Sequence, residues 1–438
     1  MTRTAQRIAI DRTDPVFGPA APGAQPASVD RFPPDAPRAA RLVLAMLGRL
    51  SRGELTMRLP DGSVRRFGTG APRAAIRLEN WRVFEVALAR GDVGFAEAWI
   101  DGGWHTDDLA SLLSLLVANR DALERAVYGS WLGRIAGHLR HMLNRNSRAG
   151  SRRNIHAHYD LGNGFYRLWL DRSMTYSSAI FDAAPAMGGK GSGGAAIGGA
   201  EDPLLRAQHA KYDRILDRLG LAPGASVLEI GCGWGGFAER ALARGLRPTG
   251  LTISSEQHAW ARERLAGAGG DARADILLRD YRDERGRYDG IASIEMFEAV
   301  GEAYWPAYFE TLKRCLKPGG RAVVQTITID DALFDRYRRG TDFIQQYVFP
   351  GGMLPSPSRF RALAREHGLE VTDAFAFGPD YARTLRIWRE RFMARLPEVR
   401  AQGFDERFVR TWEFYLAYCE AAFAHGNTDV VQFTMEAR

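Results

Sequence analysis

Hydrophobic and polar residues follow one pattern in the first part of the chain and another in the second. From residue 41 to residue 145, short alternating runs come first, and Asp61-Gly62 joins two of them as a type I′ hairpin turn would. Helix-spaced apolar residues follow, with Asp107 and Asp108 as start signals. This pattern predicts a small α+β domain, which we expect to be associated with lipid at the membrane.

The remainder of the chain, residues 146–438, predicts one larger domain. Short β-branched runs alternate there with helical segments, as in an α/β fold with a doubly wound, Rossmann-like sheet whose ligands bind at the carboxyl ends of the strands. Seven glycines at residues 184–203 predict a flexible surface insertion. Residues 1–40 hold seven prolines and little periodicity, which predicts a disordered tail.

A glycine-rich loop with Gly231, Gly233 and Gly235 follows the first predicted strand of the larger domain and opens a helix. The spacing also fits a dinucleotide site, but such a site needs an acid at the end of the second strand, where Thr252 stands. Glu229 lies just before the loop, and a carboxylate there suits the ammonium group of S-adenosylmethionine (SAM). The pattern resembles class I SAM-dependent methyltransferases.

Four blocks narrow the resemblance: HYDLGNGFYRLWLDRSMTYSSAIF, VLEIGCGWGGFAERA with GLTISSEQ, MFEAVG with VVQTIT, and YVFPGGMLPS with YARTLRIW. Together they resemble the cyclopropane fatty acid synthases and mycolic acid cyclopropane synthases, from about Arg153 to the C-terminus. The resemblance implies transfer of a methyl group from SAM to the double bond of an unsaturated acyl chain in a membrane phospholipid, forming a cyclopropane.

The same resemblance implies the residues of the site. For the SAM pocket these are Tyr159, Tyr176, Ser177, Gly231, Gly233, Thr252, Gln257, Asp280 and Tyr281. A bound bicarbonate would be the base, held by Ser178, Glu298, Gln325, Ile327 and Tyr381. Glu295 and Glu298 both follow the fourth strand, and Glu298 is chosen because it occupies the family's position.

Two residues depart from the family's pattern. The family usually has Cys where this chain has Ser178 and His where it has Gln325, and Gln cannot carry a proton near neutral pH. We expect a cyclopropane product. If the family His relays the proton, a methylene- or methyl-branched chain results instead. A non-catalytic SAM- and lipid-binding homologue is a further alternative, as is a methyltransferase for a soluble molecule or a nucleic acid base.

The stretch at about residues 330–360 predicts a cover over the acyl site. Its aromatic residues are candidates for the wall of an acyl tunnel, and its arginines for contact with a headgroup phosphate. A packed helical insertion is the alternative. The aromatic C-terminal segment WEFYLAYCEAAFAHG is more typical of a core. The named candidates are Phe334, Phe343, Tyr347 and Phe349 for the wall and Arg336, Arg338 and Arg339 for the phosphate.

Charge adds a preference for an anionic partner, because 59 Lys and Arg against 52 Asp and Glu give a formal charge of +7. No nucleic-acid recognition module is found in the sequence, so acidic lipid is expected. Six arginines and no acidic residue between Arg134 and Arg153 predict a basic amphipathic surface for such lipid, with a solvated linker as the alternative.

No run of 18 apolar residues occurs, so any membrane contact is expected to be peripheral, at the cytoplasmic face of the inner membrane. Cys232, Cys315 and Cys419 lie far apart without metal-ligand spacing, which predicts neither a disulfide framework nor a metal site. A homodimer is compatible with the sequence.

Overall fold

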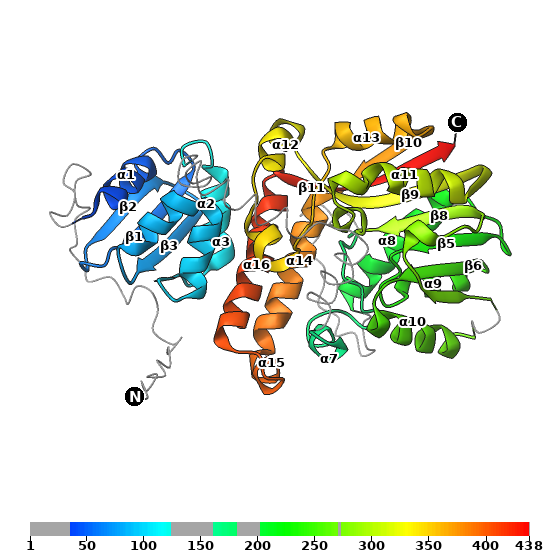
Figure 1. The fold of residues 1–438 in the computed structure, drawn as a ribbon. Helices are drawn as coiled ribbons and strands as arrows, with labels where there is room; N and C mark the ends of the chain where they lie inside the picture. The colour runs from blue at the N-terminus through cyan, green and yellow to red at the C-terminus, as the bar shows by residue number, and fades with distance from the viewer. Residues whose placement is uncertain (1–35, 124–160, 182–201, 270–272, 438) are drawn as a thin grey trace, which may run out of the picture. The chain divides into compact units, whose positions relative to one another are not determined.

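The computed structural model describes residues 36–123, 161–181, 202–269 and 273–437, which belong to two compact units divided between residues 133 and 134 (Figure 1). Most of the predicted tail, nearly all of the 184–203 insertion and the whole arginine-rich segment lie outside the described residues. Each unit is described by itself.

The N-terminal unit is the expected small α+β domain. Its mixed sheet has the order β2-β1-β3-β4, in which β1 pairs antiparallel with β2 and parallel with β3. Helix α1 begins at Arg38, so the predicted tail was drawn a few residues too long. The elements are α1 (Arg38–Leu47), β1 (Gly53–Arg58), β2 (Val64–Thr69), β3 (Arg73–Leu78), α2 (Arg82–Ile100), β4 (Trp104–His105) and α3 (Leu109–Ala118).

Two local predictions in this unit have different outcomes. Asp108 caps α3 as expected, because its side chain accepts a hydrogen bond from the backbone N–H of Ser111. The β1–β2 hairpin is confirmed, but its turn is not type I′. Gly62 has φ 84° whereas Asp61 does not have a positive φ, and the Gly62 N–H donates to the Leu59 carbonyl. This is a three-residue loop with one left-handed glycine.

The second unit contains a seven-stranded sheet of order β10-β11-β9-β8-β5-β6-β7. The strands from β9 to β7 in this order pair in parallel, while β11 is antiparallel to both β9 and β10. This is the expected class I methyltransferase topology. The strands are β5 (Ser226–Ile230), β6 (Arg247–Thr252), β7 (Asp275–Leu278), β8 (Tyr288–Ile294), β9 (Leu316–Ile329), β10 (Leu369–Ala376) and β11 (Thr428–Ala437).

Helices cover both faces of this sheet because its central strands are apolar on both sides. On β5, Leu228 and Ile230 join a core cluster with α11 and α13, whereas Val227 joins another with α8 and α9. The helices are α7 (Asn163–Tyr166), α8 (Pro203–Leu219), α9 (Gly236–Ala243), α10 (Ser255–Gly267), α11 (Trp305–Cys315), α12 (Asp331–Arg338), α13 (Pro357–Glu366), α14 (Gly378–Ala394), α15 (Leu396–Ala401) and α16 (Glu406–Ala424).

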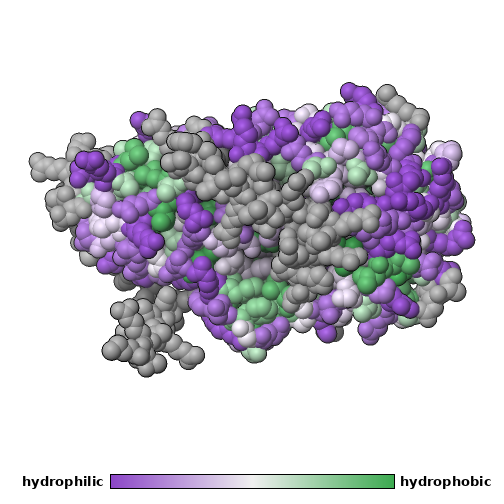
Figure 2. All heavy atoms as spheres, viewed as in Figure 1, coloured by the Kyte–Doolittle hydropathy of each residue, from purple (hydrophilic) through white to green (hydrophobic). Residues whose placement is uncertain are grey.

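Hydrophilic residues dominate the surface seen in Figure 2, with smaller hydrophobic patches between them. Within the described ranges, no helix is long and apolar enough to cross a bilayer. Only four large hydrophobic side chains of these ranges are exposed, namely Leu42, Val64, Leu278 and Phe375.

Candidate active site

One cavity of about 320 Å³ opens at the carboxyl ends of β5, β6 and β8, all in the second unit. Residues of α14, of α16 and of the segment from Tyr337 to Leu354 complete its wall. A sheet of this topology holds its ligands at this edge. Twelve of the residues expected to bind SAM or the anion line the cavity: Tyr176, Ser177, Glu229, Gly231, Gly233, Thr252, Gln257, Asp280, Tyr281, Glu298, Ile327 and Tyr381.

The glycine-rich loop brings backbone close to the cavity. Gly231 and Gly233 have φ of 82° and 52°, which favour glycine. A Cβ at Gly231 would lie 2.7 Å from the Met296 side chain, whereas a Cβ at Gly233 would meet no atom of the described ranges within 4 Å. Gly235 is different: it does not line the cavity, and its Cβ would lie 3.0 Å from Ala261 on α10. It serves helix packing.

Glu229 is buried at the end of β5 and faces the cavity. Its Oε2 atom has no hydrogen-bond partner among the residues that the structure describes. Burial raises the pKa of this carboxyl well above its ordinary value, against the opposing charge of Lys211. A buried carboxyl with an unused oxygen fits the ammonium group of SAM, which would supply the missing partner and favour the ionised form.

The other expected SAM residues are held by protein contacts. Thr252 donates to Gln257 at 2.9 Å, the Lys211 ammonium donates to the Ser177 hydroxyl at 2.6 Å, and Tyr176 shares a 2.7 Å hydrogen bond with Tyr415. These contacts fix the side chains around the space that a ligand would fill. Tyr159 lies outside the described residues.

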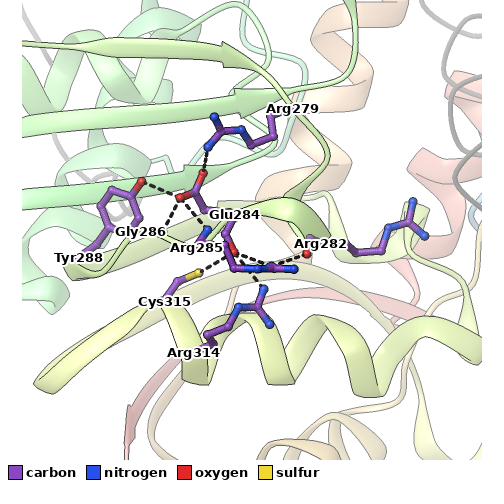
Figure 3. Close-up of polar contacts among 8 residues, drawn as sticks. All are labelled: Arg279, Arg282, Glu284, Arg285, Gly286, Tyr288, Arg314 and Cys315. Carbon is purple, nitrogen blue, oxygen red and sulfur yellow. Dashed lines mark hydrogen bonds and ion pairs between the residues drawn. The ribbon is translucent and has the colours of Figure 1, made fainter.

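Asp280 and Tyr281 lie at the start of a short 3₁₀ turn, η1 (Tyr281–Asp283), and Asp280 pairs with Arg282 at 2.6 Å. Figure 3 shows how the end of this loop is anchored. The Glu284 carboxylate accepts hydrogen bonds from the Gly286 N–H at 2.6 Å and from Arg279 at 2.8 Å. These hydrogen bonds lower the pKa of Glu284 despite its burial.

Two carboxylates stand side by side in the cavity wall after β8. The Glu295 Oε1 atom accepts 2.8 Å hydrogen bonds from the Ser178 N–H and from the Gln325 amide, and the Tyr381 hydroxyl also donates to this carboxylate. The neighbouring Glu298 carboxylate accepts from the Ile327 N–H and from the hydroxyl of Thr326. The five residues expected to hold an anion are thus brought together, but three of them contact Glu295.

A chain of hydrogen bonds behind the cavity fixes the orientation of Gln325. Its Oε1 accepts from the Gln432 amide at 3.0 Å, directly opposite on β11, so its NH₂ group must face Glu295. Gln432 in turn accepts from Arg214 at 2.6 Å, and Arg214 pairs with Asp373 at 2.9 Å. Gln325 and Ser178 are fully buried and do not line the cavity.

The two carboxylates differ in their electrostatic support. Burial, and secondly the charge of Glu295, raise the pKa of Glu298 to about 8, so Glu298 is mostly protonated at neutral pH. Burial also raises the pKa of Glu295, but Lys211 and three hydrogen-bond donors oppose that shift. Of these two carboxyl groups, Glu295 therefore has the better support for a negative charge.

The apolar half of the cavity differs from the expectation. Phe349 lines it, whereas Phe343 is fully buried, with its ring 5.3 Å from that of Tyr347, and Phe334 packs on Trp305. Helices α14 and α16 provide the rest of the apolar wall, although the C-terminal aromatic segment, which lies on α16, was expected to be core. The lining residues of these two helices include Leu385, Tyr415, Tyr418, Cys419, Ala422 and Phe423.

The predicted cover does contribute to the cavity, through Ile344 and Phe349 among others. Its residues form α12 and a turn of π-helix, Ile344–Val348. The arginines expected near a phosphate lie elsewhere: none of Arg336, Arg338 and Arg339 lines the cavity, and Arg338 pairs with Glu302 at 2.7 Å. Arg279 and Arg282 are the arginines in the wall.

The sheet topology, the glycine loop and the buried carboxylate together define a class I SAM-dependent methyltransferase. Comparison with known proteins gives the family. Residues 146–433 match the model described as mycolic acid cyclopropane synthetase. The chain belongs to this family and is a SAM-dependent fatty acid C-methyltransferase of the cyclopropane synthase type.

Two relatives align with most of this chain over most of their own length. The tuberculostearic acid methyltransferase UfaA1 of Mycobacterium tuberculosis is 42% identical over 80% of this chain and 81% of its own length. The cyclopropane-fatty-acyl-phospholipid synthase of Escherichia coli is 36% identical over 81% of this chain and 85% of its own length. Among solved structures, the mycolic acid cyclopropane synthase CmaA1 in complex with SAH and CTAB has a TM-score of 0.57 at 32% identity, over 65% of this chain and 97% of that chain.

Proposed function

We propose that this chain transfers the methyl group of SAM to the double bond of an unsaturated acyl chain esterified in a phospholipid. One observation carries the proposal: a single cavity joins the glycine loop and Glu229 to a wall of aromatic and aliphatic side chains, with two carboxylates between them. An alkene is a weak nucleophile, so it must be held in line with the methyl group in a dry site. The E. coli relative, named for a phospholipid substrate, supports the headgroup class.

SAM supplies a methyl group whose bond to sulfur breaks with the electron pair left on sulfur. The alkene π electrons form the new carbon–carbon bond, and the other alkene carbon becomes a cation. A protein carboxylate then accepts a proton from the new methyl group. The released C–H electrons either close a three-membered ring or, after a hydride shift between the two chain carbons, form a methylene branch.

We propose the methylene branch as the main product, with the cyclopropane as the alternative. Gln325 cannot relay a proton, so proton loss is slow enough for the hydride shift to occur first. The relative at 42% identity is named for tuberculostearic acid, a methyl-branched acid. A methylene branch needs no reductant, unlike a saturated methyl branch, so the reaction balances with SAM and the alkene alone.

The test uses the purified chain, SAM with a CD₃ methyl group, and vesicles of a monounsaturated phospholipid. We expect an acyl chain one methylene unit heavier that keeps two of the three deuterium atoms and takes up one hydrogen molecule on mild hydrogenation. A product that resists hydrogenation would be the ring, and would overturn the product assignment. SAM binding without lipid labelling would indicate a non-catalytic homologue, and labelling of soluble acceptors alone would overturn the substrate class.

We also propose that the enzyme meets its substrate at the cytoplasmic face of the inner membrane through peripheral, charge-dependent contact. The formal charge of +7 supports attraction to acidic headgroups. The cavity wall also includes Arg279 and Arg282, whose positive charges attract a phosphate although they pair with Glu284 and Asp280.

A further inference from the structure

Glu295 has a strained backbone at the junction of the two halves of the cavity. Its φ is 48°, in the left-handed region that favours glycine and costs other residues about 1–2 kcal/mol. Its N–H donates to the Gln325 carbonyl at 2.8 Å, directly beyond the end of β8. Such strain persists where surrounding contacts hold the residue in place, and it is concentrated at functional positions.

The donors that would hold a bicarbonate are already engaged. The Ser178 N–H, the Gln325 amide and the Tyr381 hydroxyl all donate to the Glu295 carboxylate. The Ser178 hydroxyl donates instead to the Ala179 carbonyl at 3.1 Å, and the Ile327 N–H donates to Glu298. A second anion would meet no free donor of this set and would lie against two carboxyl groups. The site does not fit bicarbonate.

We infer that the Glu295 carboxylate takes the place of bicarbonate and is itself the base that accepts the proton from the transferred methyl group. This inference rests on the proposed function. Three elements converge on this carboxylate: the segment before α8 through Ser178, β9 through Gln325 and α14 through Tyr381. The donors stabilise its charge, while its place in the cavity wall exposes it to the reacting carbon atoms.

The amide chain behind the site makes Gln325 a positioning residue for this base. Because Gln432 donates to its Oε1, the Gln325 amide can present only its NH₂ group to Glu295. Arg214 and Asp373 continue the chain to the surface of the sheet. A neutral amide is sufficient at this position because Gln325 only has to donate to Glu295 and accept from Gln432.

The first experiment measures methyl transfer from labelled SAM to monounsaturated phospholipid vesicles, in buffer freed of carbon dioxide and in the same buffer with added bicarbonate. We expect the two rates of the unaltered chain to agree within about two-fold. A rate that rises ten-fold or more with bicarbonate would overturn the inference. Absence of lipid labelling in both buffers would be a failure of the proposed function itself, so the two failures are distinguishable.

The second experiment removes the base. E295Q keeps the shape and should lower turnover at least about a hundred-fold, as loss of a general base does. E295G removes the side chain at a φ that glycine adopts freely, so turnover should fall similarly and recover at least ten-fold with bicarbonate or formate. Titration calorimetry with SAM, expected to change less than three-fold, verifies that both variants are folded.

The matched control is E302Q, because Glu302 lies on the nearby turn η3 (Glu302–Tyr304) and pairs with Arg338 outside the cavity. Its turnover should stay within two-fold of the unaltered chain. Turnover by E295Q near that of E302Q would overturn the assignment of the base.

Discussion

At the scale of single residues, Glu298 and Glu295 have separate consequences for pH. The pKa of Glu298 is about 8 in the folded chain and near 4.5 when unfolded. Between these values the unfolded chain releases the proton and the folded chain keeps it, so stability falls as pH rises through this window. E298Q removes this effect. The unfolding free energy of E298Q should exceed that of the unaltered chain by near zero at pH 4.5 and by a few kcal/mol at pH 8. The upper limit is about 1.4 kcal/mol per unit of pKa difference, and partial exposure of the Glu298 side chain reduces it.

Urea unfolding of both proteins at several pH values measures this difference. A gain that does not depend on pH would contradict the protonated state of Glu298. Because a neutral acid is replaced by a neutral amide, we also expect E298Q to keep turnover within several-fold at pH 7. The sequence alone had placed the anion chemistry on Glu298, and the contacts of Glu295 change that expectation.

Gln325 allows a second test at this scale. A neutral imidazole has one donor and one acceptor, so Q325H can donate to Glu295 and accept from Gln432 as the amide does. We expect turnover within about three-fold and a larger cyclopropane fraction, because His can move a proton near neutral pH. Q325L offers neither contact and should lose most activity. An unchanged product ratio in an active Q325H would show that this position does not govern the fate of the cation.

These residues mark what the sequence could and could not predict about the site. The glycine loop, Glu229 and the acids after β7 and β8 could be predicted because each lies at the carboxyl end of a strand or in the segment that follows it. The partners of Glu295 could not, since Ser178 is 117 positions away and the opposite placement of Gln432 depends on the register of two antiparallel strands. The positive φ of Glu295 has no sequence signal.

At the scale of elements, the loop η1 depends on Glu284. Its charge-assisted hydrogen bonds each contribute about 1.5–3 kcal/mol. E284Q should lower the unfolding free energy by about that amount at pH 7 and weaken SAM binding several-fold, because the loop carries Asp280 and Tyr281. The stability that Glu284 contributes is present above its unfolded pKa and is lost as pH falls through its lower folded pKa.

The deficit of E284Q should therefore shrink in acid, as thermal unfolding at pH 7 and pH 3 can show. E436Q provides a control, because Glu436 pairs with Arg321 at the surface, with 43% of its side chain exposed. That change should cost less than about 0.5 kcal/mol. Equal losses in the two variants would mean that the Glu284 cluster has no special role.

Helix α16 shows where element prediction was incomplete. Its aromatic segment WEFYLAYCEAAFAHG was expected to belong to a core, but the sequence does not distinguish apolar side chains that face a cavity from those that face a core. Cys419 lies in the cavity wall, so C419F should fill the apolar half. We expect SAM affinity within about three-fold, a ten-fold or greater loss of lipid methylation, and a cost in stability of about 1–3 kcal/mol from overpacking.

A424F is the matched control, because Ala424 is exposed at the end of the same helix. Calorimetry with SAM and the vesicle assay together separate the outcomes. Full lipid methylation by C419F would mean that the acyl chain does not enter this half of the cavity.

Element prediction was also incomplete at the β1–β2 turn. The Asp61-Gly62 dipeptide predicted the hairpin correctly, but the turn type depends on the loop length, which is three residues rather than two.

At the scale of the whole molecule, charge rather than a broad apolar face is expected to bring the described surface to lipid. The alternation of strands and helices was enough to predict the class I sheet, and the alternating runs before it predicted the small N-terminal sheet. The arginine-rich segment between residues 134 and 153 lies outside the described residues, so its role remains a prediction. Replacing its six arginines by Gln would reduce the formal charge from +7 to +1.

That variant should bind anionic phospholipid vesicles more weakly at low salt, by up to about 1 kcal/mol per arginine, and the difference should shrink at high salt because charges are screened. Its methylation of detergent-dispersed phospholipid should be unchanged. A control that replaces six exposed arginines of the N-terminal unit has the same formal charge: Arg49, Arg52, Arg58, Arg66, Arg73 and Arg82. Co-sedimentation with vesicles distinguishes local from global attraction. Equal weakening in both variants would mean that net charge alone acts, whereas unchanged binding in the first would exclude the segment as the lipid contact.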